Sequence, residues 1–150
     1  MIQIANRVLK IEASGIRKVF DLAAKIKNPI DLSIGRPHFD VPEKVKDEAV
    51  KAINRGFNFY TPTAGLFDLR VKIAGKFERK NRVKANPEEV IIASGASGGI
   101  FLALAALLNP GDEIILFDPY FVSYLQLSLF FGAVPKFVDT YPSFRLNAAK

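Results

Sequence analysis

The chain is 150 residues long, with 49% hydrophobic and 24% charged side chains and a formal net charge of +6. This length and composition predict one folded domain with a sizeable core and argue against intrinsic disorder. The longest apolar stretch, residues 100–108, is far shorter than the roughly 20 residues that a membrane-spanning helix needs, so we expect no membrane association.

Several other functional classes are disfavoured by what the composition lacks. Without cysteine there are no disulfides or thiolate metal sites, and His38 as the sole histidine argues against a histidine metal site or a Ser-His-Asp triad. Residues 1–7 do not have the pattern of a secretory signal, which predicts a cytoplasmic protein. Lysines and arginines are spread along the chain without a basic block, which indicates a solvated surface rather than a nucleic-acid interface.

The first 40 residues predict an arm, a helix and a strand. Residues 1–12 are expected to form an extended arm. Apolar residues then recur at helical spacing up to residue 26, behind Ser14 as the N-cap. Residues 30–34 alternate as in a short strand, which Gly35 ends.

Two further helices are predicted before residue 80. Asp40 as the N-cap and Pro42 in the first turn indicate the start of one helix, and Gly56 marks its end. Its expected buried stripe consists of Val45, Ala49, Ala52 and Ile53. Beyond a loop, residues 66–77 predict a third, amphipathic helix. The polar face of that helix carries Arg70, Lys72, Lys76, Arg79 and Lys80.

The second half of the chain changes to continuous apolar runs separated by turns. Residues 90–93 and 114–117 predict strands covered on both faces, and residues 134–138 predict an alternating strand. Between them, residues 100–108 are apolar on every side and predict a buried helix, and residues 121–131 predict another helix. This order indicates an α/β fold, a mainly parallel sheet with flanking helices joined by right-handed crossovers.

The turn at residues 94–97 (Ser-Gly-Ala-Ser) lies between a predicted strand and a predicted helix. Free backbone N–H groups and the positive end of the helix dipole converge there, which suits a phosphate, and Ser97 adds a hydroxyl donor. The same sequence also fits a tight connection without a ligand. It matches neither the Walker loop nor the dinucleotide-binding pattern.

A second candidate element, residues 118–124, follows the next buried strand. Ligands bind along the carboxyl edge of open parallel sheets, and an aromatic ring there can lie against a planar heterocycle. The alternative is that Tyr120, Phe121 and Tyr124 are core residues.

Six segments together resemble one family, the class I aminotransferases, which are fold type I pyridoxal-phosphate enzymes. The resemblance is strongest to the prokaryotic aspartate and aromatic branch and covers essentially all of the chain. The segments are residues 13–17, 34–42, 59–66, 94–99, 109–113 and 118–124.

The resemblance implies an architecture and an activity. Residues 1–40 would form an N-terminal arm and part of a small domain, and residues 41–150 the first part of the large domain that binds pyridoxal 5′-phosphate. The sheet of this PLP-transferase fold would be incomplete, with more chain expected downstream. The implied activity is amino-group transfer between an L-amino acid and a 2-oxo acid, in a homodimer whose site is shared across the interface.

The resemblance also assigns cofactor-binding residues. Gly95, Ala96 and Ser97 would bind the cofactor phosphate through their backbone N–H groups and the Ser97 hydroxyl. Phe121 falls where the family places the ring that stacks on the pyridine.

Two further positions are implied in the upstream half. Tyr60 matches the tyrosine that reaches the neighbouring subunit's cofactor phosphate, although a loop tyrosine packing under Pro62 explains it too. Gly35 matches the glycine that approaches the substrate carboxylate, and a simple turn glycine is the alternative. Arg36 and His38 depart from the family, which commonly has acidic residues there.

The family's catalytic lysine and its other ring-binding and substrate-binding residues belong to the second half of the fold, so we expect no catalytic residue in this chain. The 150 residues alone are therefore predicted to be inactive. Two alternatives remain: another fold type I enzyme, such as a carbon–sulfur lyase, and a non-catalytic or truncated fragment that self-associates. A nucleotide-binding domain is disfavoured by the missing phosphate-loop signatures.

Overall fold

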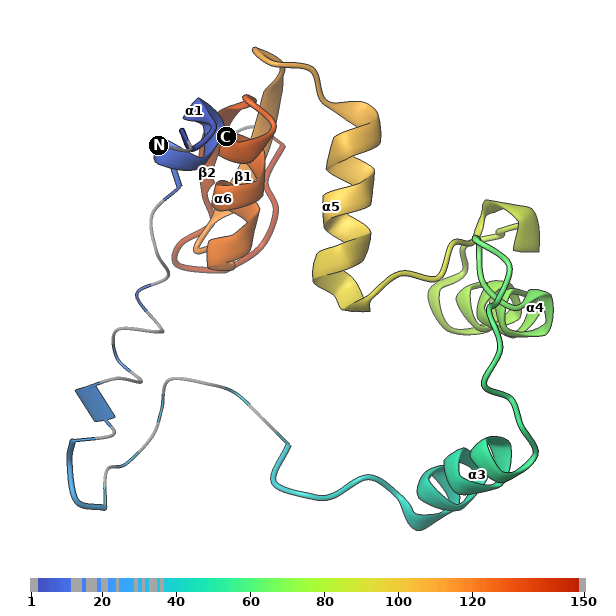
Figure 1. Ribbon diagram of the computed structural model, residues 1–150. Helices are drawn as coiled ribbons and strands as arrows, with labels where there is room; N and C mark the ends of the chain where they lie inside the picture. The colour runs from blue at the N-terminus through green and yellow to red at the C-terminus, as the bar shows by residue number, and fades with distance from the viewer. Residues whose placement is uncertain are drawn as a thin grey trace. The chain divides into compact units, whose positions relative to one another are not determined.

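The computed structural model divides the chain into two compact units, each described here by itself (Figure 1). Unit 1 comprises Met1–Ile34 and Ser94–Lys150, and unit 2 comprises Gly35–Ala93. The residues that the structure describes are 3–11, 15, 19, 22–23, 25–28, 30, 32, 35 and 37–148.

A strand–helix–strand arrangement forms the centre of unit 1. Strand β1 (Glu113–Asp118) and strand β2 (Val134–Asp139) are parallel, and helix α6 (Val122–Phe130) connects them. The register pairs Glu113 with Val134 at the amino edge and Asp118 with Asp139 at the carboxyl edge. Parallel pairing requires such a crossover, so the predicted α/β class is confirmed for this part of the chain.

Helix α6 packs against both strands and against helix α5 (Gly95–Leu107), as Figure 1 shows. Leu116 of β1 and Ala133 are buried, and Ser128 of α6 is fully buried. The Ser128 hydroxyl donates a hydrogen bond to the Tyr124 carbonyl at 2.7 Å, so its burial leaves the hydroxyl satisfied. On the α5 side, the Phe101 ring lies 5.1 Å from the Phe131 ring.

The turns at the amino edge of the sheet are bonded to each other. The Asp112 carboxylate accepts a hydrogen bond from the Asn109 N–H at 2.7 Å, which closes the turn between α5 and β1. Gly111 N–H donates to the Gly132 carbonyl at 2.8 Å, and Val134 N–H donates to the Asp112 carbonyl at 2.8 Å. The starts of both strands are therefore fixed by backbone bonds between the two turns.

Unit 2 begins with helix α3 (Glu43–Asn54), whose C-terminal end is well defined. Gly56 N–H donates to the Ile53 carbonyl and Phe57 N–H to the Ala52 carbonyl, each at 3.0 Å, which is the Schellman arrangement. This end confirms the stop predicted at Gly56. The start differs from the prediction, because Asp40 does not cap the helix: Pro42 is the N-cap residue, without a side-chain cap bond.

The rest of unit 2 is built around helix α4 (Phe67–Lys76), which continues as the π-helical turn η1 (Phe77–Asn81). A short 3-10 helix, η2 (Pro87–Glu89), packs against α4. Val90 and Ala74 are buried between these elements. The amphipathic helix predicted over residues 66–77 is therefore confirmed, with an α-helix one residue shorter at each end.

Several details of the predicted secondary structure are wrong. Residues 1–12 contain a short helix, α1 (Asn6–Leu9), instead of being extended throughout. Residues 90–93 do not form a strand: in the described chain, their N–H groups make two backbone bonds, from Val90 to the Pro87 carbonyl at 3.2 Å and from Ile92 to the Ala64 carbonyl at 3.0 Å, and neither belongs to a strand ladder. An apolar run becomes a strand only where a partner strand accepts its hydrogen bonds.

Two other predictions fall mainly outside the described residues. Of the helix predicted over residues 14–26, the structure describes Gly15, Val19, Leu22 and Ala23 in helical conformation. Of the strand predicted over residues 30–34, it describes Ile30 and Leu32 alone.

The predictions of burial are also wrong for three elements. The stripe of α3 and helix α5 were expected to be buried, but no residue of either helix is buried, and α5 is partly covered on the side that faces α6. In β1, Leu116 alone is buried, while Ile115 is 60% exposed. The sequence pattern therefore indicates more burial than the described part of the chain provides.

Candidate functional site

The candidate site begins at the N-terminus of α5. Gly95 has a φ of +68°, a conformation that L side chains rarely adopt, and no atom lies within 4 Å of the position a Cβ would take. The turn therefore requires glycine for its backbone angle, while the space beside it stays open. This geometry is suited to the close approach of a ligand to the backbone.

The first N–H groups of α5 are available to a ligand. Gly98 N–H donates to the Ser94 carbonyl at 3.3 Å, which is the first bond of the helix. Within the described residues, no protein group accepts a hydrogen bond from the N–H of Gly95, Ala96 or Ser97, and these residues are exposed. Every helix leaves such donors at its start, and the helix dipole makes them attractive to an anion.

The aromatic element follows the carboxyl end of β1. Phe121 is the N-cap residue of α6, with φ −73° and ψ 128°, and its carbonyl accepts the Tyr124 N–H at 2.9 Å. Its ring meets the Tyr124 ring edge-on, with the centroids 5.8 Å apart. At 53% exposure, the Phe121 side chain retains a large surface for contact with a ligand.

A cavity of about 440 Å³ lies between the N-terminal halves of α5 and α6. This volume falls within the ~300–1,000 Å³ range of small-molecule sites. The lining residues are Ser97, Gly98, Phe101, Val122, Ser123, Gln126 and Leu127. Ser97 and the residues immediately after Phe121 thus line one cavity, whereas the other predicted cofactor-binding residues of unit 1, Gly95, Ala96 and Phe121, are not among its lining residues.

Gln126 lies on the wall of this cavity and, in the part of the chain that the structure describes, has a hydrogen-bond acceptor without a donor. Its Oε1 is buried and has no hydrogen-bond partner among the described residues. The other polar lining groups, Ser97 and Ser123, are hydroxyl-bearing and lie near the starts of the two helices. The cavity wall is therefore mixed: apolar side chains and the Gln126 amide line its body, and the two serines lie near the helix N-termini.

Tyr60 and Gly35 lie in unit 2, and their predicted roles stay predictions. The Tyr60 side chain is fully exposed, at 106% of its reference area. The sequence alternative, in which it packs beneath Pro62, would have covered more of the ring. Gly35 is exposed, and nothing lies within 4 Å of an added Cβ. Both positions are open to contact.

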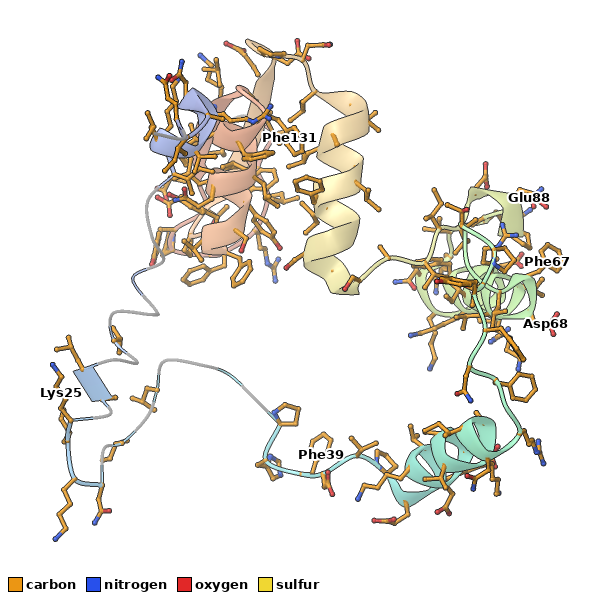
Figure 2. The ribbon with its side chains drawn as sticks, in the orientation of Figure 1. Lys25, Phe39, Phe67, Asp68, Glu88 and Phe131 are labelled. Atoms are coloured by element: carbon orange, nitrogen blue, oxygen red, sulfur yellow. The ribbon has the colours of Figure 1, made fainter. Side chains whose placement is uncertain are left out.

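Sequence reasoning missed two structurally important residues. Arg70 was placed on the polar face of its helix, yet it is buried at 9% exposure. Its Nη1 donates to the Pro87 carbonyl at 3.1 Å, and its guanidinium lies 5.3 Å from the Phe67 ring. Figure 2 marks Phe67 and Glu88; Glu88 Oε2 lies 3.8 Å from Arg70 Nη1. Helical spacing alone cannot distinguish a buried arginine from an exposed one.

The second missed residue is Thr140, which follows β2. It is buried, and both its hydroxyl and its N–H donate to the Asp118 carbonyl, at 2.7 and 3.0 Å. No sequence signal identifies this contact, because the acceptor is a backbone carbonyl 22 residues away.

Among the described residues, the shifted pKa values belong to an ion-pair cluster at the start of α3, in unit 2. The pKa of Asp40 is lowered, first by its hydrogen bond from the Lys46 ammonium at 2.6 Å and then by the Val41 N–H at 2.7 Å. The pKa of Lys46 is raised by Asp40 and then by Glu43, whose Oε1 lies 2.9 Å from the Lys46 Nζ. All of these groups are solvent-accessible, so the cluster is a surface feature.

The described residues contain no cluster of three or more histidine, aspartate or glutamate side chains that could hold a metal ion. Among the helices of the described chain, none is long and apolar enough to span a bilayer.

The arrangement just described, a parallel strand–helix–strand unit with an open helix N-terminus beside it, is part of the PLP-transferase fold. Residues 27–150 match the model of the family described as aminotransferase class I and II. The chain belongs to this family, and within it to the aspartate and aromatic type of class I.

Similar proteins cover nearly the whole chain. An aspartate aminotransferase of Pyrococcus abyssi is 38% identical over 95% of this chain, and aromatic-amino-acid aminotransferase 2 of Thermococcus litoralis is 37% identical over 96%. The solved aspartate aminotransferase of Rhizobium meliloti superposes with a TM-score of 0.93 at 36% identity, over 99% of this chain. The chain spans only 38% of the length of each of the two sequence relatives and 39% of the solved structure.

Proposed function

We propose that the protein carrying this chain is a pyridoxal-phosphate-dependent aminotransferase that moves an amino group between an L-amino acid and a 2-oxo acid. The family uses pyridoxal phosphate. The observation that carries the proposal for this chain is the set of unpartnered N–H groups at the start of α5, beside the cavity between α5 and α6. When bound, this cofactor withdraws electrons from the bonds at the substrate α-carbon.

The residues of the α5 turn fit the phosphate end of that cofactor. The N–H groups of Gly95, Ala96 and Ser97 would donate to the phosphate oxygens, and the Ser97 hydroxyl would add a fourth donor. The open space at Gly95 supports this fit, because a phosphate must approach the backbone closely.

Phe121 would lie against the flat pyridine ring. The Phe121 side chain is half exposed, and the next residue, Val122, lines the same cavity as Ser97. The contact would be purely apolar, and offset stacking of aromatic rings contributes about 0.5–1.5 kcal/mol beyond the burial of their surface.

The remaining roles concern the assembled enzyme. We propose a homodimer in which the exposed Tyr60 reaches the partner's cofactor phosphate, and in which the backbone of Gly35 lies near the substrate carboxylate. The relatives' names support aspartate or an aromatic amino acid as the donor. The proposed acceptor is 2-oxoglutarate, and the proposed location is the cytoplasm. Residues 1–150 alone would not turn over substrate, because the family's catalytic lysine is expected outside them.

The proposal is tested by ligand binding to residues 1–150. Pyridoxamine 5′-phosphate is the suitable probe, because it has no aldehyde and cannot condense with the 13 lysines of the chain. We expect it to bind more tightly than pyridoxamine without phosphate, and we expect Ser97→Ala and Phe121→Ala each to weaken binding. Equal affinity for the two probes, or no binding of either, would overturn the proposal.

A second candidate function, self-association without catalysis, is favoured by the surface of α5. Leu102 and Leu107 are 53% and 75% exposed on a helix that carries no buried residue. Uncovered apolar helices associate in water. Sedimentation of residues 1–150 distinguishes the candidates: a larger assembly that does not bind the phosphorylated probe supports self-association alone.

A further inference from the structure

The connection from β1 to α6 is short and ends on the proposed stacking ring. Only Pro119, Tyr120 and Phe121 lie between the last residue of β1 and the first residue of α6. The path of this connection therefore sets where the Phe121 ring lies. A contact that holds the start of the connection therefore also restrains the Phe121 ring, which is only three residues further on.

The start of the connection is held by two hydrogen bonds from one residue. The strand ladder ends at the pair Asp118 and Asp139, and the Thr140 N–H extends it by donating to the Asp118 carbonyl at 3.0 Å. The Thr140 hydroxyl donates to the same carbonyl at 2.7 Å. One bond already satisfies the Asp118 carbonyl, so the second, which uses the other lone pair, adds directional restraint.

The middle of the connection is held by the same strand. The Tyr120 ring stacks on the Phe137 ring of β2, with the centroids 5.4 Å apart and the planes inclined by 30°. Residues of β2 and its end thus contact the connection at two successive points, the Asp118 carbonyl and the Tyr120 ring.

The far end of the connection is held by α6. The Phe121 carbonyl accepts the Tyr124 N–H at 2.9 Å, and the two rings meet edge-on. The Phe121 ring is therefore restrained on both sides along the chain, yet half of its surface remains exposed. A ring held in its binding position before the ligand arrives does not lose conformational entropy on binding.

We propose that Thr140 is a positioning residue for the aromatic ring of Phe121, acting through the Asp118 carbonyl, and that Phe137 supports it by stacking on Tyr120. This inference rests on the proposed function, because it assumes that Phe121 contacts the cofactor ring. It adds to that function a residue distant in sequence from the binding motifs.

The test compares two substitutions of Thr140 in the protein expressed with all the sequence that its gene encodes. Thr140→Val keeps the shape and the backbone N–H bond but removes the hydroxyl, and Thr140→Ser keeps the hydroxyl. Thr63→Val makes the same chemical change at an exposed threonine of unit 2 and serves as the matched control. The probe is pyridoxamine 5′-phosphate.

Two quantities are measured: the dissociation constant and the induced circular dichroism per bound probe, which depends on how the pyridine ring lies against the protein. We expect Thr140→Val to weaken binding about 3- to 10-fold, because a Phe121 ring that is no longer held in place must be ordered when the probe binds, and to reduce the induced signal. Thr140→Ser and Thr63→Val should resemble the wild type. If the hydroxyl serves stability alone, its removal would lower the unfolding midpoint but leave the induced signal of the folded, saturated protein unchanged.

A second variant covers the case in which Thr140→Val does not fold. Phe137→Leu removes the stack on Tyr120 at a side chain that is 51% exposed, and it should weaken binding and reduce the induced signal in the same direction. Wild-type affinity and wild-type signal in every folded variant of Thr140 and Phe137 would overturn this inference while leaving the proposed function intact. A wild type that does not prefer the phosphorylated probe would overturn the proposed function, and this inference with it.

Discussion

The strand–helix–strand part of unit 1 and helix α3 of unit 2 are both built from well-formed elements, but they differ in burial. In unit 1, α6 covers the strands, Ser128 is fully buried and Leu116 is buried in β1. In unit 2, α3 has a complete C-terminal motif and salt-bridged first turns, and no residue of it is buried. Helix ends form from local contacts, whereas burial requires a partner surface.

This difference shows that an apolar stripe indicates that a helix is suited to burial, not that it is buried. The stripe of α3 and the apolar surface of α5 are typical of buried helices, yet no residue of either helix is buried in the described chain, although α6 packs against one side of α5. The apolar residues of α3 and α5 therefore indicate contacts with a surface that the described residues do not provide. This interpretation agrees with the length of the relatives, because the chain spans only 38% of the Pyrococcus abyssi enzyme.

The largest expected effect is at Gly65, in the packed part of unit 2. Gly65 has a φ of +97°, and an added Cβ would overlap Cγ1 of Ile92. Gly65→Ala should therefore destabilise this part of unit 2 by about 3 kcal/mol or more, from the left-handed conformation and the overlap together. Denaturant unfolding followed by hydrogen exchange of the α4 amides measures the loss.

The matched control for Gly65→Ala is Gly56→Ala. Gly56 has a φ of +78°, but nothing lies within 4 Å of its added Cβ. Strain without overlap should cost about 1 kcal/mol and affect the end of α3 alone. Equal losses for the two variants would show that the close contact of Gly65 with Ile92 does not matter.

Arg70 gives the next largest effect. Arg70→Ala should cost about 2–4 kcal/mol, because it removes one of the two hydrogen bonds to the Pro87 carbonyl, which also accepts the Val90 N–H, and opens a space beside Phe67. Arg70→Met, which fills the space without donating, should recover part of the loss. If both variants unfold at the wild-type denaturant concentration, Arg70 does not hold η2 against α4.

The sequence predicted the local structure well, for identifiable reasons. Helices α3, α4, α5 and α6 were expected from apolar spacing, glycine stops and turn sequences, and β1 and β2 from apolar runs that end in turns. Each of these signals acts within a few residues. The family followed from the order of several short motifs, and the match over residues 27–150 confirms it.

The errors have a common physical origin in contacts between distant segments. Whether residues 90–93 form a strand depends on a partner strand, and whether α5 is buried depends on covering surfaces. The position of Arg70 on the buried side of α4 depends on η2, and the role of Thr140 depends on a carbonyl 22 residues earlier. No local pattern carries this information. The candidate turn at Gly95 was found because its signal is local.

The exposed surface of α5 should change association without changing stability. Leu107→Gln replaces a side chain that is 75% exposed, so we expect the free energy of unfolding to change by no more than about 0.5 kcal/mol. Self-association of residues 1–150, measured by sedimentation at several concentrations, should fall. The same substitution at the buried Leu116 of β1 should instead unfold unit 1. A large stability loss at Leu107 would show that α5 is covered in the isolated chain.

The smallest expected effect is the pH dependence of the start of α3. The pKa of Asp40 is lowered from its ordinary value of 3.8, so its contribution is present above that value and is lost as the pH falls through the lowered folded value. The pKa of Lys46 is raised above 10.5, so its contribution is complete below that value and is lost as the pH rises through the raised folded value. Between these limits, protection of the first α3 amides should not depend on these two groups.

Both side chains are solvent-exposed, so the effect should be confined to the first turns of α3 and should weaken with added salt. Asp40→Asn should remove the acid-side change while leaving the Schellman end at Gly56 unaltered, and Asp68→Asn, which alters an exposed carboxylate outside the cluster, should leave the change in place. Amide hydrogen exchange, corrected for its intrinsic pH dependence, distinguishes these outcomes. An acid-side change that extends to the α4 amides would mean that α3 and the packed part of unit 2 respond together, and the contrast between locally formed and mutually buried elements would not hold within this unit.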